Sequence, residues 1–153
     1  MYQTILLAYD GTRESRLALR EGAEIAERFG AFTHLLAVIN LPAALLGGEA
    51  LAAGDGMARE IERSQEILDE GIERLKARGL RCVGHLERGE PPETIGRIAR
   101  EIHADLIVLG YHRRHGFDKW WHTPTCSLLI DQSPTSLLVA IQDGQTETGK
   151  KNP

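Results

Sequence analysis

Side chains with useful chemistry gather in one stretch of this chain, LGYHRRHGFDKWWHTPT, residues 109–125. Three histidines, two arginines and a lysine lie there within a dozen residues. Guanidinium and ammonium groups bind phosphate oxygens, whereas imidazole groups bind transition metals. The stretch therefore indicates a phosphate-binding loop or a metal-binding loop, with a solvated polar loop as the third interpretation.

Metal binding has little further support. The potential zinc ligands of this loop are His112, His115, His122 and Cys126. Pro124 interrupts the spacing between the last two of them, and no carboxylate-rich or CxxC element accompanies them. We therefore expect no metal site and interpret these side chains as part of a solvated loop.

Nucleophilic catalysis has less support still. Cys126 and Ser127 have histidines near them in the sequence, but neither a nucleophile elbow nor the residue order of a catalytic triad surrounds them. We expect no catalytic residues, and hence a protein that is not an enzyme.

An adjacent tryptophan pair is the other unusual feature of the loop. Four of the eight aromatic residues of the chain fall here, namely Tyr111, Phe117, Trp120 and Trp121. An adjacent pair cannot easily bury both rings in one core, so at least one ring is expected to face a pocket or a partner. A local cluster that covers the end of a sheet is the alternative.

Short apolar runs form the framework that must position this loop. Continuous apolar runs at residues 5–9, 35–39, 106–109 and 137–141 are typical of strands buried on both faces, as in a parallel sheet covered by helices. A more polar run at residues 81–87 is typical of an edge strand.

Helical patterns separate these runs. The expected helices cover residues 13–29, lie within 58–79, cover 92–103, and run from Thr123 to before Pro134. Thr12 is the expected N-cap of the first helix and Gly30 its C′ residue, while Gly79 ends the second. Alternation of strands and helices indicates a doubly wound α/β fold with a parallel sheet.

The remaining segments lack such patterns. Residues 41–56, rich in alanine, glycine and leucine, are expected to form a mobile connection, and the polar tail at 143–153 is expected to be disordered. A chain of 153 residues is then most simply one domain over residues 1–142.

The composition indicates which classes of partner and which cellular compartment to expect. A net charge of −4 argues against nucleic-acid binding, which requires a basic face. The apolar runs are far shorter than the roughly 20 residues that span a bilayer, and the amino end shows no signal peptide. Cys82 and Cys126 have no paired spacing, as in a reducing compartment. We expect a cytoplasmic protein without a membrane or nucleic-acid partner.

The expected position of a ligand follows from the fold class. In open α/β sheets ligands bind beyond the carboxyl ends of the strands, where the strand order reverses. Asp10 and Gly110 directly follow the first and fourth apolar strands in the sequence, so both face one crevice if these strands are neighbours. The alternative is structural: Asp10 caps a turn, and Gly110 permits a tight exit from its strand.

Three segments resemble the universal stress protein family over nearly the whole chain. They are ILLAYDGTRESRLALREGAEIA, LERGEPPETIGRIAREIHADLIVLG and DQSPTSLLVAI. The resemblance implies a five-stranded parallel sheet of order 3-2-1-4-5, which reverses between the first and fourth strands. It also implies homodimers formed through the fifth strand, Ser136 to Ile141, whose sequence has no lysine or proline to protect an exposed edge.

The resemblance further implies an ATP site built on the pattern G-x2-G-x9-G-[ST], with an aspartate at the end of the first strand. Asp10 and Gly110 match this pattern. Arg113 stands in place of the second glycine, and Thr123 and Pro124 stand in place of the final pair.

These departures remove backbone donors from the phosphate site. A glycine-rich turn holds phosphate through closely approaching N–H groups, which a side chain at position 113 restricts and which Pro124 lacks. We expect weakened or absent ATP binding in a regulatory or protective dimer. The alternatives are an adenine-nucleotide sensor that uses Arg113 and Arg114, an enzyme such as a slow ATPase or a metal-dependent hydrolase, and an interaction module that uses the tryptophan pair. The candidate site residues are Asp10, Val38, Gly110, Arg113, Thr123 and Thr125.

Overall fold

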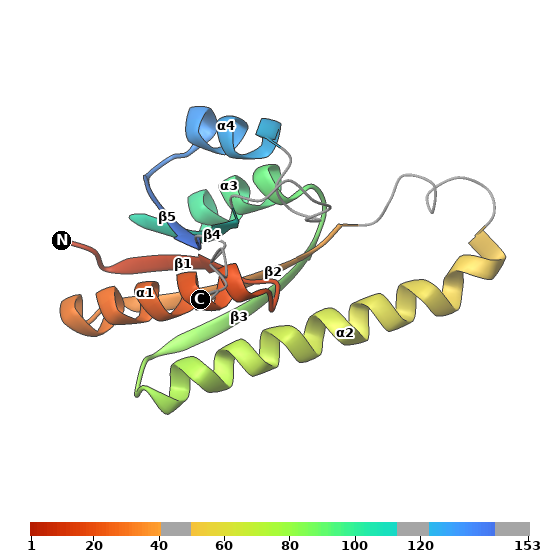
Figure 1. Cartoon of the computed structure of the whole chain (residues 1–153), viewed down its shortest axis with the longest axis horizontal. Helices are drawn as coiled ribbons and strands as arrows, with labels where there is room; N and C mark the ends of the chain where they lie inside the picture. Colours follow the sequence, from red (N-terminus) through yellow and green to blue (C-terminus); the bar gives the residue numbers. More distant parts are fainter. Residues whose placement is uncertain (41–49, 113–122, 143–153) are drawn as a thin grey trace, which may run out of the picture.

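The computed structural model describes residues 1–40, 50–112 and 123–142, and gives side-chain surroundings for 1–40, 54–111 and 128–142 (Figure 1). The tail predicted at 143–153 lies outside the described residues. Strands and helices alternate in the order β1 Thr4–Ala8, α1 Arg13–Phe29, β2 Phe32–Ile39, α2 Ala50–Ala77, β3 Cys82–Arg88, α3 Pro91–Glu101, β4 Leu106–His112, α4 Thr123–Gln132 and β5 Ser136–Gln142.

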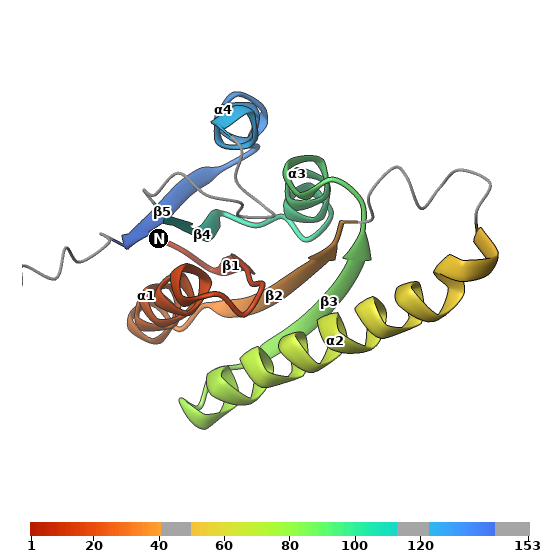
Figure 2. The same cartoon turned by 45° about the vertical axis from the view of Figure 1, so that its right-hand side comes forward.

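The five strands form one sheet in which every neighbouring pair is parallel. Their order is β3-β2-β1-β4-β5, which confirms the predicted topology (Figure 2). The order reverses between β1 and β4, so the predicted switch point is also confirmed. The polar strand β3 and the apolar strand β5 lie at the two edges, as expected.

Two helices cover each face of the sheet, because successive strand residues point to opposite sides. Ile5 and Leu7 of β1 belong to the cluster packed under α1 and α2. Leu6 and Ala8 belong to the cluster packed under α3 and α4, on the opposite face (Figure 1). The uninterrupted apolar run of β1 is therefore explained by burial on both sides.

The helix signals of the sequence match both ends of α1 and the end of α2, whereas α3 spans Pro91–Glu101 instead of the predicted 92–103. Thr12 has an extended backbone, and its side chain accepts a hydrogen bond from the Ser15 amide, as an N-cap does. Gly30 adopts the left-handed conformation, with φ of 65°, at the end of α1. Helix α2 ends at Ala77, two residues before Gly79.

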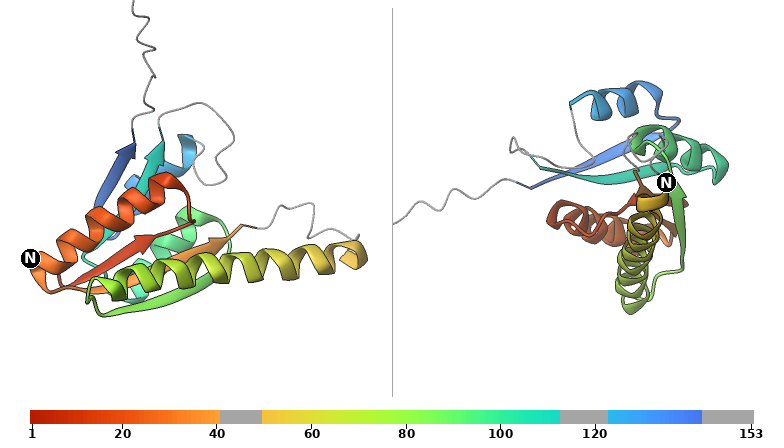
Figure 3. Two further views of the ribbon diagram at one scale, coloured as in Figure 1. Left: turned by 60° about the horizontal axis from the view of Figure 1, so that its bottom comes forward. Right: turned by 90° about the vertical axis from the view of Figure 1, so that its right-hand side faces the viewer.

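Helix α2 begins earlier than predicted, at Ala50, so the expectation of a mobile connection over 41–56 is wrong for residues 50–56. Residues 41–49 lie outside the described residues. Extending an existing helix adds one hydrogen bond per residue and needs no new nucleus. The alanines of this segment favour the extension, although each glycine disfavours the helix by about 1 kcal/mol. The added turns extend beyond the end of the sheet (Figure 3).

Among the residues that the structure describes, no helix combines the length and the apolar character needed to cross a bilayer.

Candidate functional site

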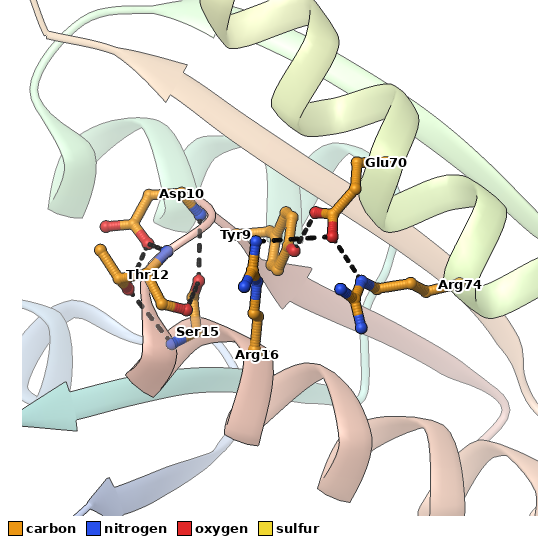
Figure 4. Close-up of polar contacts among 7 residues, drawn as sticks. All are labelled: Tyr9, Asp10, Thr12, Ser15, Arg16, Glu70 and Arg74. Atoms are coloured by element: carbon orange, nitrogen blue, oxygen red, sulfur yellow. Dashed lines mark hydrogen bonds and ion pairs between the residues drawn. The ribbon is translucent and has the colours of Figure 1, made fainter.

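Asp10 lies at the carboxyl end of β1, where the topology places a ligand. Its Oδ1 atom accepts hydrogen bonds from the backbone amide of Thr12 at 3.0 Å and from the Thr12 hydroxyl at 2.5 Å (Figure 4). The Thr12 hydroxyl in turn accepts from the Ser15 amide at 3.3 Å. This carboxylate therefore supports the turn that starts α1, as in the structural alternative considered for Asp10.

The same carboxylate retains capacity for a ligand. Oδ2 of Asp10 makes no hydrogen bond to any other described residue, and the side chain is half-buried. The backbone amide of Asp10 donates to the Ser15 hydroxyl at 3.4 Å. Asp10 is thus held in one orientation with one oxygen still able to accept a hydrogen bond.

Val38 lies in β2, beside Glu87 of β3 in the sheet register. Only 5% of its surface is exposed, and it packs with Ala8 and Ile95 in the core between the sheet and α3. The fold therefore places Val38 mainly in the core, with a small area left for contact with a ligand.

Gly110 occupies a different position from the one predicted. It lies within β4, paired with Ala140 of β5, and does not follow the strand. A Cβ atom at this position would lie 2.2 Å from the Glu14 carbonyl oxygen and 2.7 Å from the Ser15 nitrogen. The missing side chain thus lets β4 pack against the first turn of α1, and that side of Gly110 is filled by protein rather than open to a crevice.

A buried tyrosine beside Asp10 was not singled out from the sequence. Tyr9 is fully buried, and its hydroxyl donates a hydrogen bond to Oε2 of Glu70 in α2 (Figure 4). Glu70 also pairs with Arg74 at 2.5 Å and with Arg16 of α1 at 3.6 Å. Only the i,i+4 spacing of Glu70 and Arg74 was visible in the sequence, since Tyr9 lies 61 residues before Glu70.

Burial and hydrogen bonding shift the pKa values of Tyr9 and Glu70. Burial, and then the hydrogen bond to Glu70, raises the pKa of Tyr9 from 10.0 to about 12. Burial opposes ionisation of Glu70, but hydrogen bonds from Tyr9 and Arg74 outweigh it and lower the Glu70 pKa. The neutral phenol and the ionised carboxylate are thus the stable pair at neutral pH, and they join β1 to α2.

The close approach of α2 depends on a glycine next to Glu70. A Cβ atom at Gly71 would lie 2.5 Å from a methyl carbon of Leu35 and 2.9 Å from the Tyr9 ring. The Tyr9 ring therefore packs directly against the backbone of α2, beneath the turn that carries Asp10.

The sequence model of the universal stress protein family matches residues 1–140. The chain belongs to this family.

Solved universal stress proteins share its fold. One from Burkholderia pseudomallei is 24% identical, with a TM-score of 0.73, over 90% of this chain and 95% of that one. One from Archaeoglobus fulgidus, solved in complex with dAMP, is 24% identical, with a TM-score of 0.65, over 90% and 97%. One from Arabidopsis thaliana, solved with AMP bound, is 13% identical, with a TM-score of 0.67, over 97% of each chain.

A search of curated proteins by sequence finds no match. Membership of the universal stress protein family therefore rests on the family model, while the solved structures add the fold.

The other predicted site residues lie within residues 113–122, which follow β4, or at the start of α4. Arg113 lies outside the described residues, as do Arg114, His115, Trp120, Trp121 and His122. Thr123 and Thr125 lie in the first turn of α4, which is described by its backbone only. Their contribution to a phosphate site, and that of the tryptophan pair to a partner surface, stay predictions.

The expectation that the protein has no metal site can be compared with the structure only for the described residues. Among the described residues, no group of three or more histidine, cysteine, aspartate or glutamate side chains is arranged to hold a metal ion. This finding does not cover His112 at the end of β4, nor His115, His122 and Cys126, because their side chains are not described.

Proposed function

We propose that this universal stress protein is a non-catalytic, homodimeric component of a cytoplasmic stress response, and that it binds ATP weakly or not at all. The observation that carries the proposal is the position of Pro124 as the second residue of α4. Helix α4 begins at Thr123, so Pro124 lies where the family pattern calls on backbone amides to hold phosphate.

The loss of amides has a large expected effect on triphosphate binding. The first turn of a helix offers unpaired N–H groups, and proline removes one of them. A side chain in place of glycine at position 113 restricts a second. A hydrogen bond to a charged group contributes about 1.5–3 kcal/mol. Two losses would weaken binding by roughly two to four powers of ten at about 1.4 kcal/mol per decade.

Isothermal titration of the full chain with ATP tests this proposal. We expect a dissociation constant weaker than about 100 μM, or no measurable heat. A triple variant, Arg113→Gly with Thr123→Gly and Pro124→Ser, restores the family pattern and should bind ATP measurably more tightly than the natural chain. A low-micromolar constant for the natural chain would contradict the proposal, as would a restored variant with unchanged affinity.

A second function is supported by the ligands of relatives. Structures of family members are described with AMP, dAMP and cAMP, each of which carries one phosphate. A monophosphate needs fewer phosphate contacts than ATP, and Oδ2 of Asp10 can still accept a hydrogen bond from a ribose or a base. An adenine-nucleotide sensor of this kind would use Arg113 and Arg114 for the phosphate.

Thermal stabilisation by AMP distinguishes the sensor from the first proposal. A ligand that binds only the folded state raises the unfolding temperature. If AMP stabilises the protein and replacement of both arginines by alanine removes the effect, the sensor function is supported. If millimolar AMP leaves the unfolding temperature unchanged, the sensor function is excluded.

The proposed dimer is supported by the edge of the sheet at β5. Ile141 of β5 is 46% exposed, and Leu128 and Ile130 of the adjacent α4 are 46% and 62% exposed. An edge strand with apolar side chains and unpaired backbone groups needs a cover, and a two-fold partner that pairs the same strand provides one.

A further inference from the structure

Two histidines from neighbouring strands meet at the β3 side of the sheet. His34 lies in β2 and His85 in β3, and Nδ1 of His34 lies 2.8 Å from Nε2 of His85. The two ring planes are inclined by only 20°, with their centres 5.1 Å apart. Both side chains are half-buried. The contact joins residues 51 positions apart, so no sequence spacing revealed it.

The register of the sheet explains this meeting. His85 lies directly beside Leu36, and His34 directly beside Val83, so the histidines are diagonal neighbours. His34 also lies beside Leu6, which belongs to the core cluster on the α3 and α4 face. The pair therefore lies on that face of the sheet.

The histidine pair is partly accessible to solvent. Val83, beside His34, is 41% exposed. On the other side of His34 the ring of Phe32 lies 5.1 Å away, centre to centre, and Arg81 covers that phenyl ring at 5.8 Å. The histidines thus stand at the rim of the core, where strands hold their backbones and solvent reaches their rings.

We propose that His34 and His85 form a two-histidine site for a divalent late transition-metal ion, bound through Nδ1 of His34 and Nε2 of His85 with water completing the coordination.

The nitrogen separation fits such a site. An ion bound by imidazole nitrogens at about 2.0–2.1 Å would hold two of them about 2.9 Å apart at a right angle and about 3.3 Å apart at a tetrahedral angle. The observed 2.8 Å is near the first value, which suits the tetragonal geometry of copper(II) and nickel(II). Rotation of the rings toward a common point is the adjustment required.

The chemistry of the pair favours the same ligand. Neutral imidazole is the form of histidine that binds metals. No third histidine, cysteine or carboxylate completes a cluster among the described residues, which therefore supply two ligands there. Copper(II) should bind most tightly of the first-row divalent ions, followed by nickel(II) and zinc(II).

The experiment uses the full chain with three other histidines replaced. His112, His115 and His122 are replaced by asparagine in every variant, because they could bind the same ions. Copper(II), nickel(II) and zinc(II) chloride are then titrated at neutral pH, and affinity, stoichiometry and unfolding temperature are measured. We expect one copper ion per chain, a raised unfolding temperature, and an electron paramagnetic resonance spectrum that indicates two imidazole nitrogens.

Single substitutions decide the assignment. His34→Gln and His85→Gln should each weaken copper binding by at least about tenfold, the loss that follows even from removal of a supporting group around a metal. His103→Asn is the matched control, because His103 has a positive φ of 52° that asparagine also tolerates. This control should leave copper affinity unchanged.

Two outcomes would overturn the proposal. One is the absence of stoichiometric binding when circular dichroism shows a folded chain, in which case the pair is an N–H···N hydrogen bond only. The other is copper binding that both glutamine variants retain. Circular dichroism of each variant shows whether it is folded, and either single variant suffices if the other does not fold. Neither outcome bears on the proposed ATP site.

Discussion

Gly110 of β4 lies so close to Glu14 of α1 that a Cβ atom on the glycine would be 2.2 Å from the Glu14 carbonyl oxygen. Both partners are backbone, which cannot swing aside as the end of a long side chain can. The position matches a glycine of the family's ATP pattern, yet in this chain it also sets the distance between the sheet and α1. Changes at Gly110 therefore affect folding before they affect any ligand.

Gly110→Ala should destabilise the protein by about 1–3 kcal/mol, because it inserts a carbon into a filled space. Denaturant unfolding measures this. Gly96→Ala is the control, since its Cβ would make only an ordinary contact of 3.6 Å with Arg100 inside helix α3. Alanine should stabilise that helix by roughly 0.5–1 kcal/mol. Equal stabilities of the two variants would contradict the packing role of Gly110.

Tyr9 should ionise only in strong alkali. Its pKa of about 12 predicts one late step in the tyrosinate absorbance of the native protein, and Tyr9→Phe should lack that step. Because the folded pKa is above the ordinary 10.0, Tyr9 contributes fully to stability below pH 10 and loses this contribution as the pH rises toward 12.

The size of this contribution follows from the shift. About two pKa units correspond to at most about 3 kcal/mol between pH 10 and 12. Stability measured against pH should fall less steeply over this interval in Tyr9→Phe than in the natural chain. Parallel pH profiles for the two proteins would be incompatible with the Tyr9–Glu70 hydrogen bond.

Asp10 should tolerate loss of charge better than loss of its oxygen. Asp10→Asn keeps a side-chain acceptor for the Thr12 amide and should change the free energy of unfolding by less than about 0.5 kcal/mol. Asp10→Ala removes the acceptor and should destabilise by about 1 kcal/mol, as should Thr12→Ala at the N-cap. Thermal unfolding of the three variants checks this order, and a more stable Asp10→Ala than Asp10→Asn would refute the turn interpretation.

The β5 edge should control assembly. Ile141→Lys adds a charge to the proposed dimer surface and should shift the protein toward the monomer in sedimentation velocity experiments. Val83→Lys is the matched control, because Val83 is 41% exposed on β3 at the opposite edge. A dimer that persists with Ile141→Lys but dissociates with Val83→Lys would place the interface at β3 and contradict the prediction.

Hydrophobic patterns and capping residues made most of the helices and strands predictable from the sequence. Continuous apolar runs marked the buried strands, Thr12 and Gly30 marked the ends of α1, and a polar run marked the edge strand β3. The strand order followed only from the resemblance to a family, because each helix could in principle carry its strand to either side of the sheet. The early start of α2 was missed because the glycines in this segment disfavour a helix locally. Extension from the stable helix that follows needs no new nucleus, and this outweighs their effect.

The sequence by itself determined which segments form the helices and strands, apart from the start of α2 and the end of β4, and it placed Asp10 at the carboxyl end of β1. Only the tertiary structure decided that Gly110 lies inside β4 against α1, that Tyr9 reaches Glu70, and that His34 meets His85. The reason is physical: propensity, capping and periodicity act over a few residues, whereas strand register and helix packing determine contacts between residues 51 to 96 positions apart.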